Sequence, residues 1–418
     1  MQTLTAKKDI SRTALLFAVL YCVSYMTRIN FGAVISEMEK DTGIARDLLS
    51  LSLTCSFFTY GIGQIFSGIL ADKFSPKRLI TIGLGITTGV NLILPFIPSP
   101  YVMLVLWGIN GVAQALMWPP IVRLLICHLS YEDYKMTVAR VGYGSSVGTM
   151  LIYLLSPLII FLLSWRAVFW FCALIGGAMI FVWERIGLDV EKAPVIKEVK
   201  DAPQYESGAL AAFLSPMMFG IMAAIALQGM LRDGVTTWMP TFISETYDIS
   251  NLISILTGFV LPIFSIVCIR LAATVFKQWL KNPMTCAGLF FGIGLVSALG
   301  LVLCSGRVAL LSVLFSAILT GAMHGANLMF TSMLSPAFQK YGKVSTVSGV
   351  LNACTYLGSA ASTYGIAVLS ERSGWTVTLL VWLGIAMLGT ALCFLTASSW
   401  HRHFMSEDAS RAQSTEAA

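Results

Sequence analysis

The sequence predicts an all-helical integral membrane protein with about twelve membrane-spanning helices. Hydrophobic residues make up 56% of its 418 positions, charged residues only 11%, and the mean hydropathy is +0.79. These values lie far outside the range of soluble globular proteins. Apolar runs separated by short polar breaks recur along the whole chain, and a helix needs about 20 residues to cross the hydrocarbon layer. About twelve such helices fit into the chain.

The first apolar run follows three basic residues, Lys7, Lys8 and Arg12, as it would in a signal peptide. It continues past Arg28, however, without the small-residue pattern of a cleavage site. We therefore expect it to form the first membrane-spanning helix, at residues 13–36. Five more spans are expected at residues 47–71, 79–97, 100–127, 137–163 and 167–184.

A charged segment at residues 185–208 separates these six spans from six others. The second set is expected at residues 216–243, 251–276, 284–304, 308–334, 345–369 and 376–397. The chain is thus predicted to divide into an N-terminal six-helix bundle (1–184), a linker loop (185–208), a C-terminal six-helix bundle (209–399) and a polar tail (400–418).

A weak repeat supports two pseudo-symmetric halves. Two pairs of identical residues lie 210 positions apart: Gly148 with Gly358, and Trp165 with Trp375. Arg28 and Arg232 lie 204 positions apart in the first span of each half. Two bundles related by an axis along the membrane normal would place these first helices opposite each other across a central cavity. On that arrangement the two arginines would face one ligand.

Basic residues between the spans predict the orientation of the chain. If the spans alternate in direction, one side receives Lys7, Lys8, Arg12, Lys73, Lys77, Arg78, Lys135, Arg185, Lys192, Lys197, Lys200, Lys277, Lys281, Lys340, Lys343, Arg402 and Arg411. The other side receives Lys40, Arg46, Arg166, Arg307 and Arg372. The positive-inside bias predicts that both termini are cytoplasmic. We expect a multi-pass protein of the bacterial cytoplasmic (inner) membrane. These charges form no dense patch, so no nucleic-acid partner is expected.

Arg28 and Arg232 are the strongest indication of function, because each lies well inside a predicted span. A cation inside a bilayer costs at least ~3 kcal/mol on insertion scales, so it usually faces a polar cavity where something neutralises it. A guanidinium offers a planar fork of donors that fits phosphate, sulfonate or carboxylate oxygens. We expect both arginines to bind a small anionic solute. The alternative for each is a snorkelling or internally paired side chain.

Signatures of enzymes are missing from the sequence. It contains no G-x-x-x-x-G-K-[ST], no H-E-x-x-H and no metal-spaced cysteines, since its nine cysteines are scattered through the apolar runs. We therefore expect no enzymatic activity, no cofactor and no bound metal. Without an ATP-binding motif, transport would draw on solute gradients.

The loop between the second and third spans carries the motif Gly68-Ile-Leu-Ala-Asp72-Lys73-Phe-Ser-Pro-Lys77-Arg78. It resembles the signature of the major facilitator superfamily, G-x-x-x-D-[RK]-x-x-x-[RK]-[RK]. The resemblance implies the major facilitator fold and a gating role for the five numbered residues. A simple anchoring loop at the membrane surface is the alternative. The corresponding place in the second half, residues 269–273, has no acidic residue.

Three further strings resemble the organophosphate:phosphate antiporters of that superfamily. They are Tyr25-Met-Thr-Arg28-Ile-Asn30-Phe31, Trp118-Pro119-Pro120-x-x-Arg123 and Arg232-x-Gly234-Val235-x-x-Trp238-x-Pro240-Thr241. The resemblance covers nearly the whole chain. It implies that Arg28 and Arg232 bind the phosphoryl group of a substrate.

The chain also departs from that family. Gln64 and Ser145 stand where its members have a lysine and a histidine that assist phosphate binding. Asp233 follows Arg232 where an aromatic residue is usual, and Arg140 appears near the start of the fifth span. Asp233 is expected either to couple transport to a proton gradient or to act as an internal counter-ion, with Arg140 as a charge-balancing or surface residue.

Several uncharged side chains are candidates to line the substrate cavity, with close packing as the alternative. They are Tyr25, Trp118, Tyr143 and Asn327, together with Gln64 and Ser145.

The function expected from these observations is that of a monomeric secondary transporter working by alternating access in the lipid bilayer. We expect it to exchange an organophosphate or phosphonate-like anion for inorganic phosphate. One alternative is a proton-coupled symporter of an organic carboxylate or sulfonate that uses Asp233. Another is a non-transporting receptor for an organophosphate.

Overall fold

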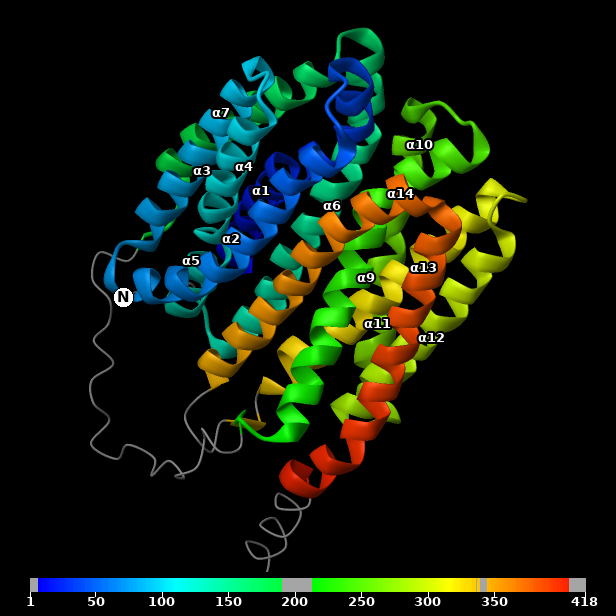
Figure 1. The fold of residues 1–418 in the computed structure, drawn as a ribbon. Coiled ribbons are helices and arrows are strands. Elements are labelled where there is room, and N and C mark those ends of the chain that lie inside the picture. Colours follow the sequence, from blue (N-terminus) through cyan, green and yellow to red (C-terminus); the bar gives the residue numbers. More distant parts are fainter. Residues whose placement is uncertain (1–6, 190–212, 336, 339–343, 406–418) are drawn as a thin grey trace, which may run out of the picture. The chain divides into compact units, whose positions relative to one another are not determined.

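The computed structural model describes residues 7–189, 213–335, 337–338 and 344–405, in which the regular elements are helices (Figure 1). They are α1 (Lys7–Thr42), α2 (Arg46–Lys73), α3 (Pro76–Ile93), α4 (Pro100–Ala115), α5 (Trp118–His128), α6 (Tyr131–Leu162), α7 (Trp165–Ile186), α9 (Pro216–Tyr247), α10 (Asn251–Thr257), α11 (Val260–Gln278), α12 (Pro283–Cys304), α13 (Ala309–Leu328) and α14 (Val344–Trp400). Short π-helical turns follow α13 and α14, at Met329–Met333 and His401–Met405.

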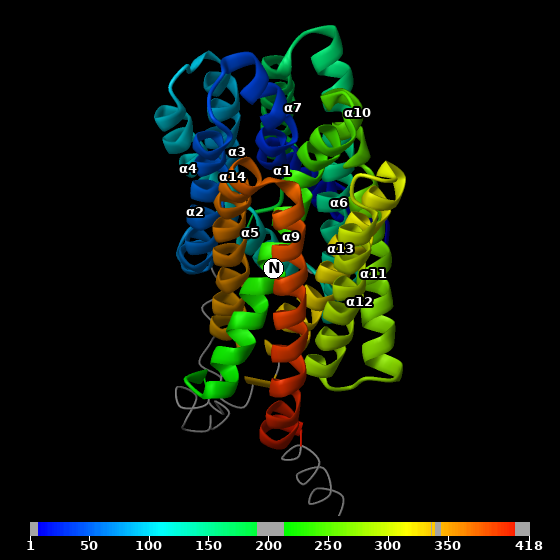
Figure 2. The same ribbon diagram turned by 45° about the vertical axis from the view of Figure 1, so that its right-hand side comes forward.

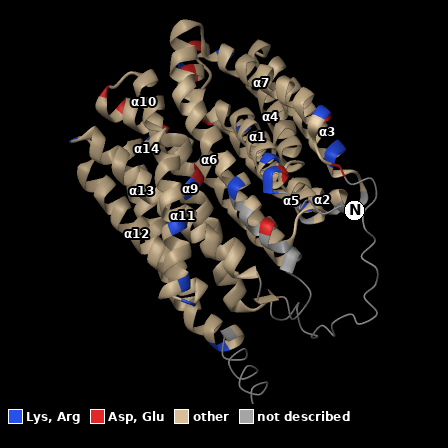
Figure 3. Cartoon of the chain, turned by 180° about the vertical axis from the view of Figure 1, so that it is seen from behind, with Lys and Arg blue, Asp and Glu red and all other residues tan. Residues whose placement is uncertain are grey.

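Eleven helical stretches in the described part of the chain are long and apolar enough to cross a membrane. The last of them, Val347–Phe404, is 58 residues long, and Gly374 interrupts it with the non-helical backbone angles φ 76° and ψ 173°. Figure 2 shows the two parts of α14 running in opposite directions from this bend. Counted separately, they make the twelve spans that the sequence predicts. Figure 3 shows that the helices carry no charge over most of their length.

The chain forms two compact units, and neither is a continuous stretch of sequence. Unit 1 contains Met1–Ala202, Thr237–Ile263 and Thr363–Arg372, and unit 2 contains Pro203–Thr236, Phe264–Ser362 and Ser373–Ala418. The ends of α9 and of the first part of α14 therefore cluster with the first-half helices. The division into bundles 1–184 and 209–399 is a different partition, and it stays a prediction.

Glycines bring α1 and α6 of unit 1 into backbone contact. A Cβ atom on Gly144 would lie 2.3 Å from the carbonyl oxygen of Ala18, and one on Gly148 would lie 2.5 Å from that of Cys22. No side chain fits at such distances, so only glycine permits this packing. The contact fixes α6 directly behind the turn of α1 that precedes Arg28.

A buried polar network joins α1, α3 and α4 in unit 1. Ser24 donates to Oε1 of Gln114 at 2.5 Å, Asn30 donates to Oδ1 of Asn91 at 2.6 Å, and Gln114 donates to the hydroxyl of Thr27 at 3.0 Å. Asn110 and Thr87 belong to the same network. All seven side chains are at most 2% exposed. Because unpaired polar groups are costly in an apolar interior, the network favours one rotation of α1 about its axis.

A charged cluster lies at another place in unit 1, where α1, α2, α9 and α14 meet. The Arg46 side chain, 8% exposed, donates to Glu39 at 3.1 Å and forms an ion pair with Glu245. Its guanidinium also contacts Ser370 at 3.4 Å and lies 6.0 Å from the ring of Trp238. We call these five residues the Arg46 cluster.

In unit 2, α9 and the first part of α14 also approach each other through glycines. A Cβ atom on Gly229 would lie 2.0 Å from the carbonyl oxygen of Thr355, and one on Gly358 would lie 2.0 Å from that of Ala226. On another face of α9, Gln228 donates to the carbonyl oxygen of Met323 in α13 at 2.9 Å. The turn of α9 that carries Arg232 is thereby held between α13 and α14.

Candidate functional site

Arg28 of α1 is half-buried and faces aromatic rings of unit 1. Its guanidinium carbon lies 3.8 Å from the ring centroid of Tyr60, 5.5 Å from that of Tyr25 and 5.7 Å from that of Phe57. A cation over an aromatic face at such distances gains about 0.5–2 kcal/mol. The rings therefore hold the planar guanidinium in place while α1 and α2 position it.

The aromatic cluster continues from Tyr25 toward α5. The ring of Tyr21 lies 5.0 Å from that of Tyr25 and 4.9 Å from that of Trp118, centroid to centroid. Three sequence-predicted site residues, Arg28, Tyr25 and Trp118, are thus joined in one cluster.

The sequence analysis did not identify three of the aromatic residues that lie around Arg28 and Tyr25, namely Tyr21, Phe57 and Tyr60. A signal for two of them exists, because Phe57 and Tyr60 precede Gln64 on α2 at spacings of seven and four residues. Residues at such spacings share one face of a helix. Since Gln64 was already a candidate, its helical neighbours could have been added.

Four other predicted site residues belong to the helices of unit 1. Gln64 of α2 is half-buried, and Tyr143 of α6 is 36% exposed. The hydroxyl of Ser145 donates to the carbonyl oxygen of Gly142, one turn earlier in its own helix, at 2.6 Å. Arg140 is exposed.

Arg232 of α9 forms an ion pair with the residue that follows it. Its Nε donates to Oδ1 of Asp233 at 2.8 Å and its Nη2 donates to Oδ2 at 2.6 Å. The two side chains are 9% and 17% exposed. The hydroxyl of Ser359 in α14 donates to Oδ2 of the same carboxylate at 2.5 Å. Both carboxylate oxygens of Asp233 thus accept hydrogen bonds within unit 2.

Other polar and aromatic side chains of unit 2 surround this pair. The Arg232 guanidinium lies 5.6 Å from the ring of Tyr356. His324 of α13 contacts the hydroxyl of Ser265 at 3.1 Å and the carbonyl oxygen of Thr320 at 2.9 Å. The predicted cavity residue Asn327 is half-buried one turn further along α13. Ser359, which touches Asp233 directly, was missed, and nothing in the local sequence distinguishes it from other serines.

Within the described residues, two buried side-chain oxygens near this region lack a hydrogen-bond partner. They are Oδ1 of Asn327 and Oε1 of Gln228, the latter one turn before Arg232. A buried carbonyl oxygen without a donor is costly and is commonly satisfied by water or a ligand.

The predicted gating motif lies where α2 ends and α3 begins. The side chains of Asp72 and Lys73 lie outside the described part of the structure. Lys77 donates to the carbonyl oxygen of Glu184 at 3.0 Å, and the backbone of Arg78 donates to the Ser75 hydroxyl that caps α3. A Cβ atom on Gly68 would meet nothing within 4 Å.

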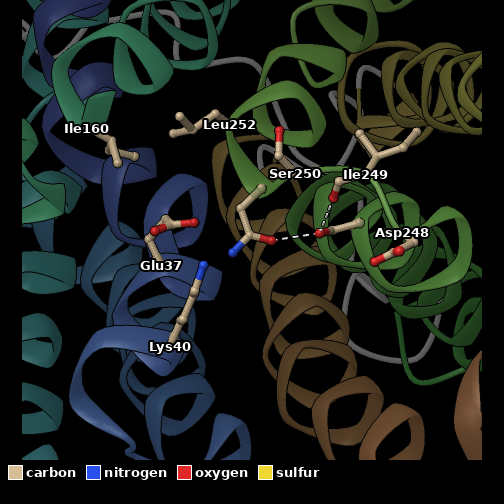
Figure 4. Close-up of a pocket in the computed structure, with 9 residues that line it drawn as sticks. Glu37, Lys40, Ile160, Asp248, Ile249, Ser250 and Leu252 are labelled. Atoms are coloured by element: carbon tan, nitrogen blue, oxygen red, sulfur yellow. Dashed lines mark hydrogen bonds between the residues drawn. The ribbon is translucent and has the colours of Figure 1, made fainter. Parts of the chain in front are cut away.

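A cavity of about 550 Å³ lies in unit 1 (Figure 4). Glu37 and Lys40 of α1 face it from one side, Ser250 lies on the other, and Leu252 lies beside Ile160. Its remaining lining residues are Ile160, Ser244, Asp248, Ile249 and Asn251. None of the nine belongs to the site predicted from the sequence.

Comparison with protein families gives a match over most of the chain. The model described as "Major Facilitator Superfamily" matches residues 17–363. That range includes Arg28, Arg232, Asp233 and the loop motif at Gly68–Arg78.

Two curated relatives are named for phosphate-ester transport. A "Probable hexose phosphate transport protein" of Chlamydia pneumoniae is 29% identical over 146 residues, which cover 35% of this chain and 32% of that protein. The "Glycerol-3-phosphate transporter" of Bacillus subtilis is 24% identical over 304 residues, which cover 66% of this chain and 67% of that protein. The chain spans about a third to about half of the length of the first relatives it matches.

A solved structure supports the same fold. The crystal structure of a bacterial homolog of the human lysosomal transporter Spinster, inward-facing and unoccupied, superposes with a TM-score of 0.80 at 13% identity. The match covers 95% of this chain and 99% of that one. At this identity, the likeness concerns the fold alone.

Proposed function

Because the chain belongs to the major facilitator superfamily and is related to its organophosphate:phosphate antiporters, we propose that it carries a small organic anion across the membrane, bound by Arg28 and Arg232. The protein is a multi-pass secondary transporter and not an enzyme. The observation that carries the proposal is an arginine of each unit within a membrane-spanning helix: Arg28 on α1 in unit 1, and Arg232 on the part of α9 that belongs to unit 2. Such cations persist in membranes where they serve a transported ligand.

The first candidate cargo is an organophosphate or a phosphonate-like anion that is exchanged for inorganic phosphate. Its support is the relatives named for hexose phosphate and glycerol 3-phosphate. The guanidinium groups suit oxyanions because they can donate two parallel hydrogen bonds. The Gln64 and Ser145 positions weaken this candidate, because each brings a neutral side chain to a place where the family has a basic or titratable one.

Exchange would follow from alternating access around charged groups. An unoccupied site with uncompensated positive charge is costly to close away from water, and a bound anion removes that cost. If only the loaded carrier reorients, one anion returns for each one that enters.

The second candidate is proton-coupled symport of an organic carboxylate or sulfonate. The observation that favours it is the pair of Arg232 with Asp233, because a carboxylate that already balances the arginine lets the empty carrier reorient. When a substrate anion takes over the guanidinium, the released carboxylate can accept a proton.

Proteoliposomes distinguish the two candidates. Vesicles loaded with inorganic phosphate should release it only when an organophosphate is supplied outside, if the protein is an exchanger. Alkalinisation outside the vesicle on addition of a carboxylate or sulfonate, absent in Asp233→Asn, would identify the symporter. If the wild-type protein gives neither phosphate release nor alkalinisation with any class of anion, the proposed function is refuted.

A further inference from the structure

The carboxylate of Asp233 occupies the edge of the Arg232 guanidinium that an oxyanion would use. It binds Nε at 2.8 Å and Nη2 at 2.6 Å, in the two-point geometry that also suits phosphate, sulfonate and carboxylate ligands. A transported anion that approaches Arg232 in this way therefore meets a competitor that is part of the chain.

Packing of α9 against α14 holds the competitor in place. Ser359 donates to Oδ2 of Asp233 at 2.5 Å, and the neighbouring Gly358 allows α14 to touch the backbone of α9 at Ala226. The Ser359 hydroxyl lies farther from its other acceptors, the carbonyl oxygens of Thr355 (3.0 Å) and Gly229 (3.3 Å). The pair is thus supported by two helices and does not depend on one flexible side chain.

A histidine and a tyrosine of unit 2 lie in the region of this pair. Nδ1 of His324 in α13 contacts the carbonyl oxygen of Thr320 and the hydroxyl of Ser265. Tyr356 of α14 presents an aromatic ring to the guanidinium. With Asp233 ionised, Arg232 and Asp233 together carry no formal charge.

This balance has a consequence for the charge of the ligand. A lone arginine attracts a dianion more strongly than a monoanion, because each negative charge adds Coulomb energy. Beside the Arg232–Asp233 pair, each additional negative charge is also repelled by the carboxylate, so the pair itself gives a dianion no advantage over a monoanion. A dianion also has a larger desolvation cost than a monoanion, and the uncharged pair does not offset this cost.

We propose that Asp233 determines the charge of the substrate, so that the site accepts a singly charged anion in preference to a dianion. Suitable ligands are a carboxylate, a sulfonate or a phosphate ester that retains one proton. The inference rests on the proposed function, since it takes Arg232 as a ligand of the transported anion. It adds a specificity-determining residue and a charge class of substrate.

Methyl sulfate and methyl phosphate are matched probes for this inference. Both join a methyl group to a tetrahedral oxyanion, but at about pH 8 the phosphate has lost its second proton and carries one more negative charge. The test measures the thermal stabilisation of the full-length, detergent-solubilised protein by each probe at constant ionic strength, since a ligand that prefers the folded state raises the Tm.

Wild-type protein is expected to respond to methyl sulfate at a concentration at least about tenfold lower than to methyl phosphate. In Asp233→Asn, methyl phosphate should stabilise the protein at a lower concentration than methyl sulfate. The reason is that the positive charge of Arg232 is no longer balanced, while the Asn side chain can still accept a hydrogen bond from Ser359. Asp233→Ser is a second neutral variant in case the Asn variant does not fold. Ser362→Ala is the control: Ser362 lies three residues after Ser359, and its hydroxyl donates to the carbonyl oxygen of Met230 at 2.8 Å. This variant should retain the wild-type order.

Two results would overturn the inference: a wild-type preference for methyl phosphate, which needs no variant to observe, or the same order of probes with and without the Asp233 charge. A failure of the proposed function looks different. In that case neither probe, nor any organic anion, stabilises either the wild type or the neutral variants.

Discussion

Arg28 and Arg232 are the same residue type in corresponding helices, yet their surroundings differ. Arg28 lies over the ring of Tyr60 at 3.8 Å, with Tyr25 and Phe57 nearby, whereas Arg232 is bound by the carboxylate of Asp233. A planar guanidinium can stack on a ring and still donate hydrogen bonds from its edge. Aromatic rings thus surround Arg28, whereas a carboxylate binds Arg232.

Arg28→Lys is expected to lower kcat/KM for the transported anion about ten- to hundredfold, although the charge is preserved. Lysine offers a point charge in place of the fork, and the loss corresponds to about 1.5–3 kcal/mol for a charged hydrogen bond. Arg185→Lys is the matched control, because the Arg185 guanidinium also lies over a ring, that of Phe181 at 5.0 Å, but on an exposed helix end. Equal uptake by both variants would mean that Arg28 has only a structural role.

At the scale of single elements, the polar network between α1, α3 and α4 and the glycine contacts of α6 and α14 have one effect in common. They fix the rotation and depth of the helices that carry Arg28 and Arg232. In a membrane, where lipid tails are as apolar as leucine, close backbone approach and interhelical hydrogen bonds replace the hydrophobic effect as the source of helix association.

Gly358→Ala should destabilise the protein, because the new Cβ would lie 2.0 Å from the carbonyl oxygen of Ala226 and force α9 and α14 apart. Overpacking of this kind costs about 1–3 kcal/mol, so a lower Tm is expected in detergent. Gly365→Ala is the control on the same helix, since its Cβ would meet nothing within 4 Å. That substitution should leave the Tm unchanged or raise it, because alanine favours helix by up to about 1 kcal/mol. Equal shifts in the two variants would contradict the close contact.

At the scale of the whole molecule, the two compact units do not coincide with the two halves of the sequence. The segments Thr237–Ile263 and Thr363–Arg372 belong to unit 1, and the Arg46 cluster is one of the contacts that hold them there. Ser36 of α1 and Thr241 of α9 add a hydrogen bond of 2.7 Å. Alternating access, as proposed, requires such contacts to break and re-form during each cycle.

Arg46→Ala should loosen the end of α9 and raise the hydrogen–deuterium exchange of residues 237–247. Removing the arginine leaves Glu39 and Glu245 close to each other without their shared cation. The free energy of unfolding should fall by less than the roughly 3–5 kcal/mol that is lost when a fully buried ion pair is broken, because Glu245 is 40% exposed. Arg166→Ala is the control, since the Arg166–Asp41 pair is 38% and 50% exposed and such pairs contribute about 0–1 kcal/mol. Unchanged exchange in Arg46→Ala would show that the cluster does not hold α9.

The sequence by itself determined the all-helical membrane fold, the approximate limits of the spans and the presence of an arginine in the first span of each half. These features are local, because the hydropathy of about 20 consecutive residues decides whether a helix can span the membrane. The helix ends extend a few residues beyond the predicted spans, as at Lys7–Thr42 against 13–36, since polar residues continue a helix outside the hydrocarbon layer. The aromatic neighbours of Arg28 were only partly predictable, through the helical spacing of Tyr60 and Gln64.

Only the tertiary structure decided what each arginine touches. Asp233 was open to two interpretations from sequence, a proton carrier or a counter-ion, and its bond to Ser359, 126 positions away, could not be read from either local string. The sequence also did not show that the end of α9 groups with the helices of the first half. The physical reason is that such contacts depend on the rotation and depth of packed helices, which glycine contacts and buried hydrogen bonds set together across the fold.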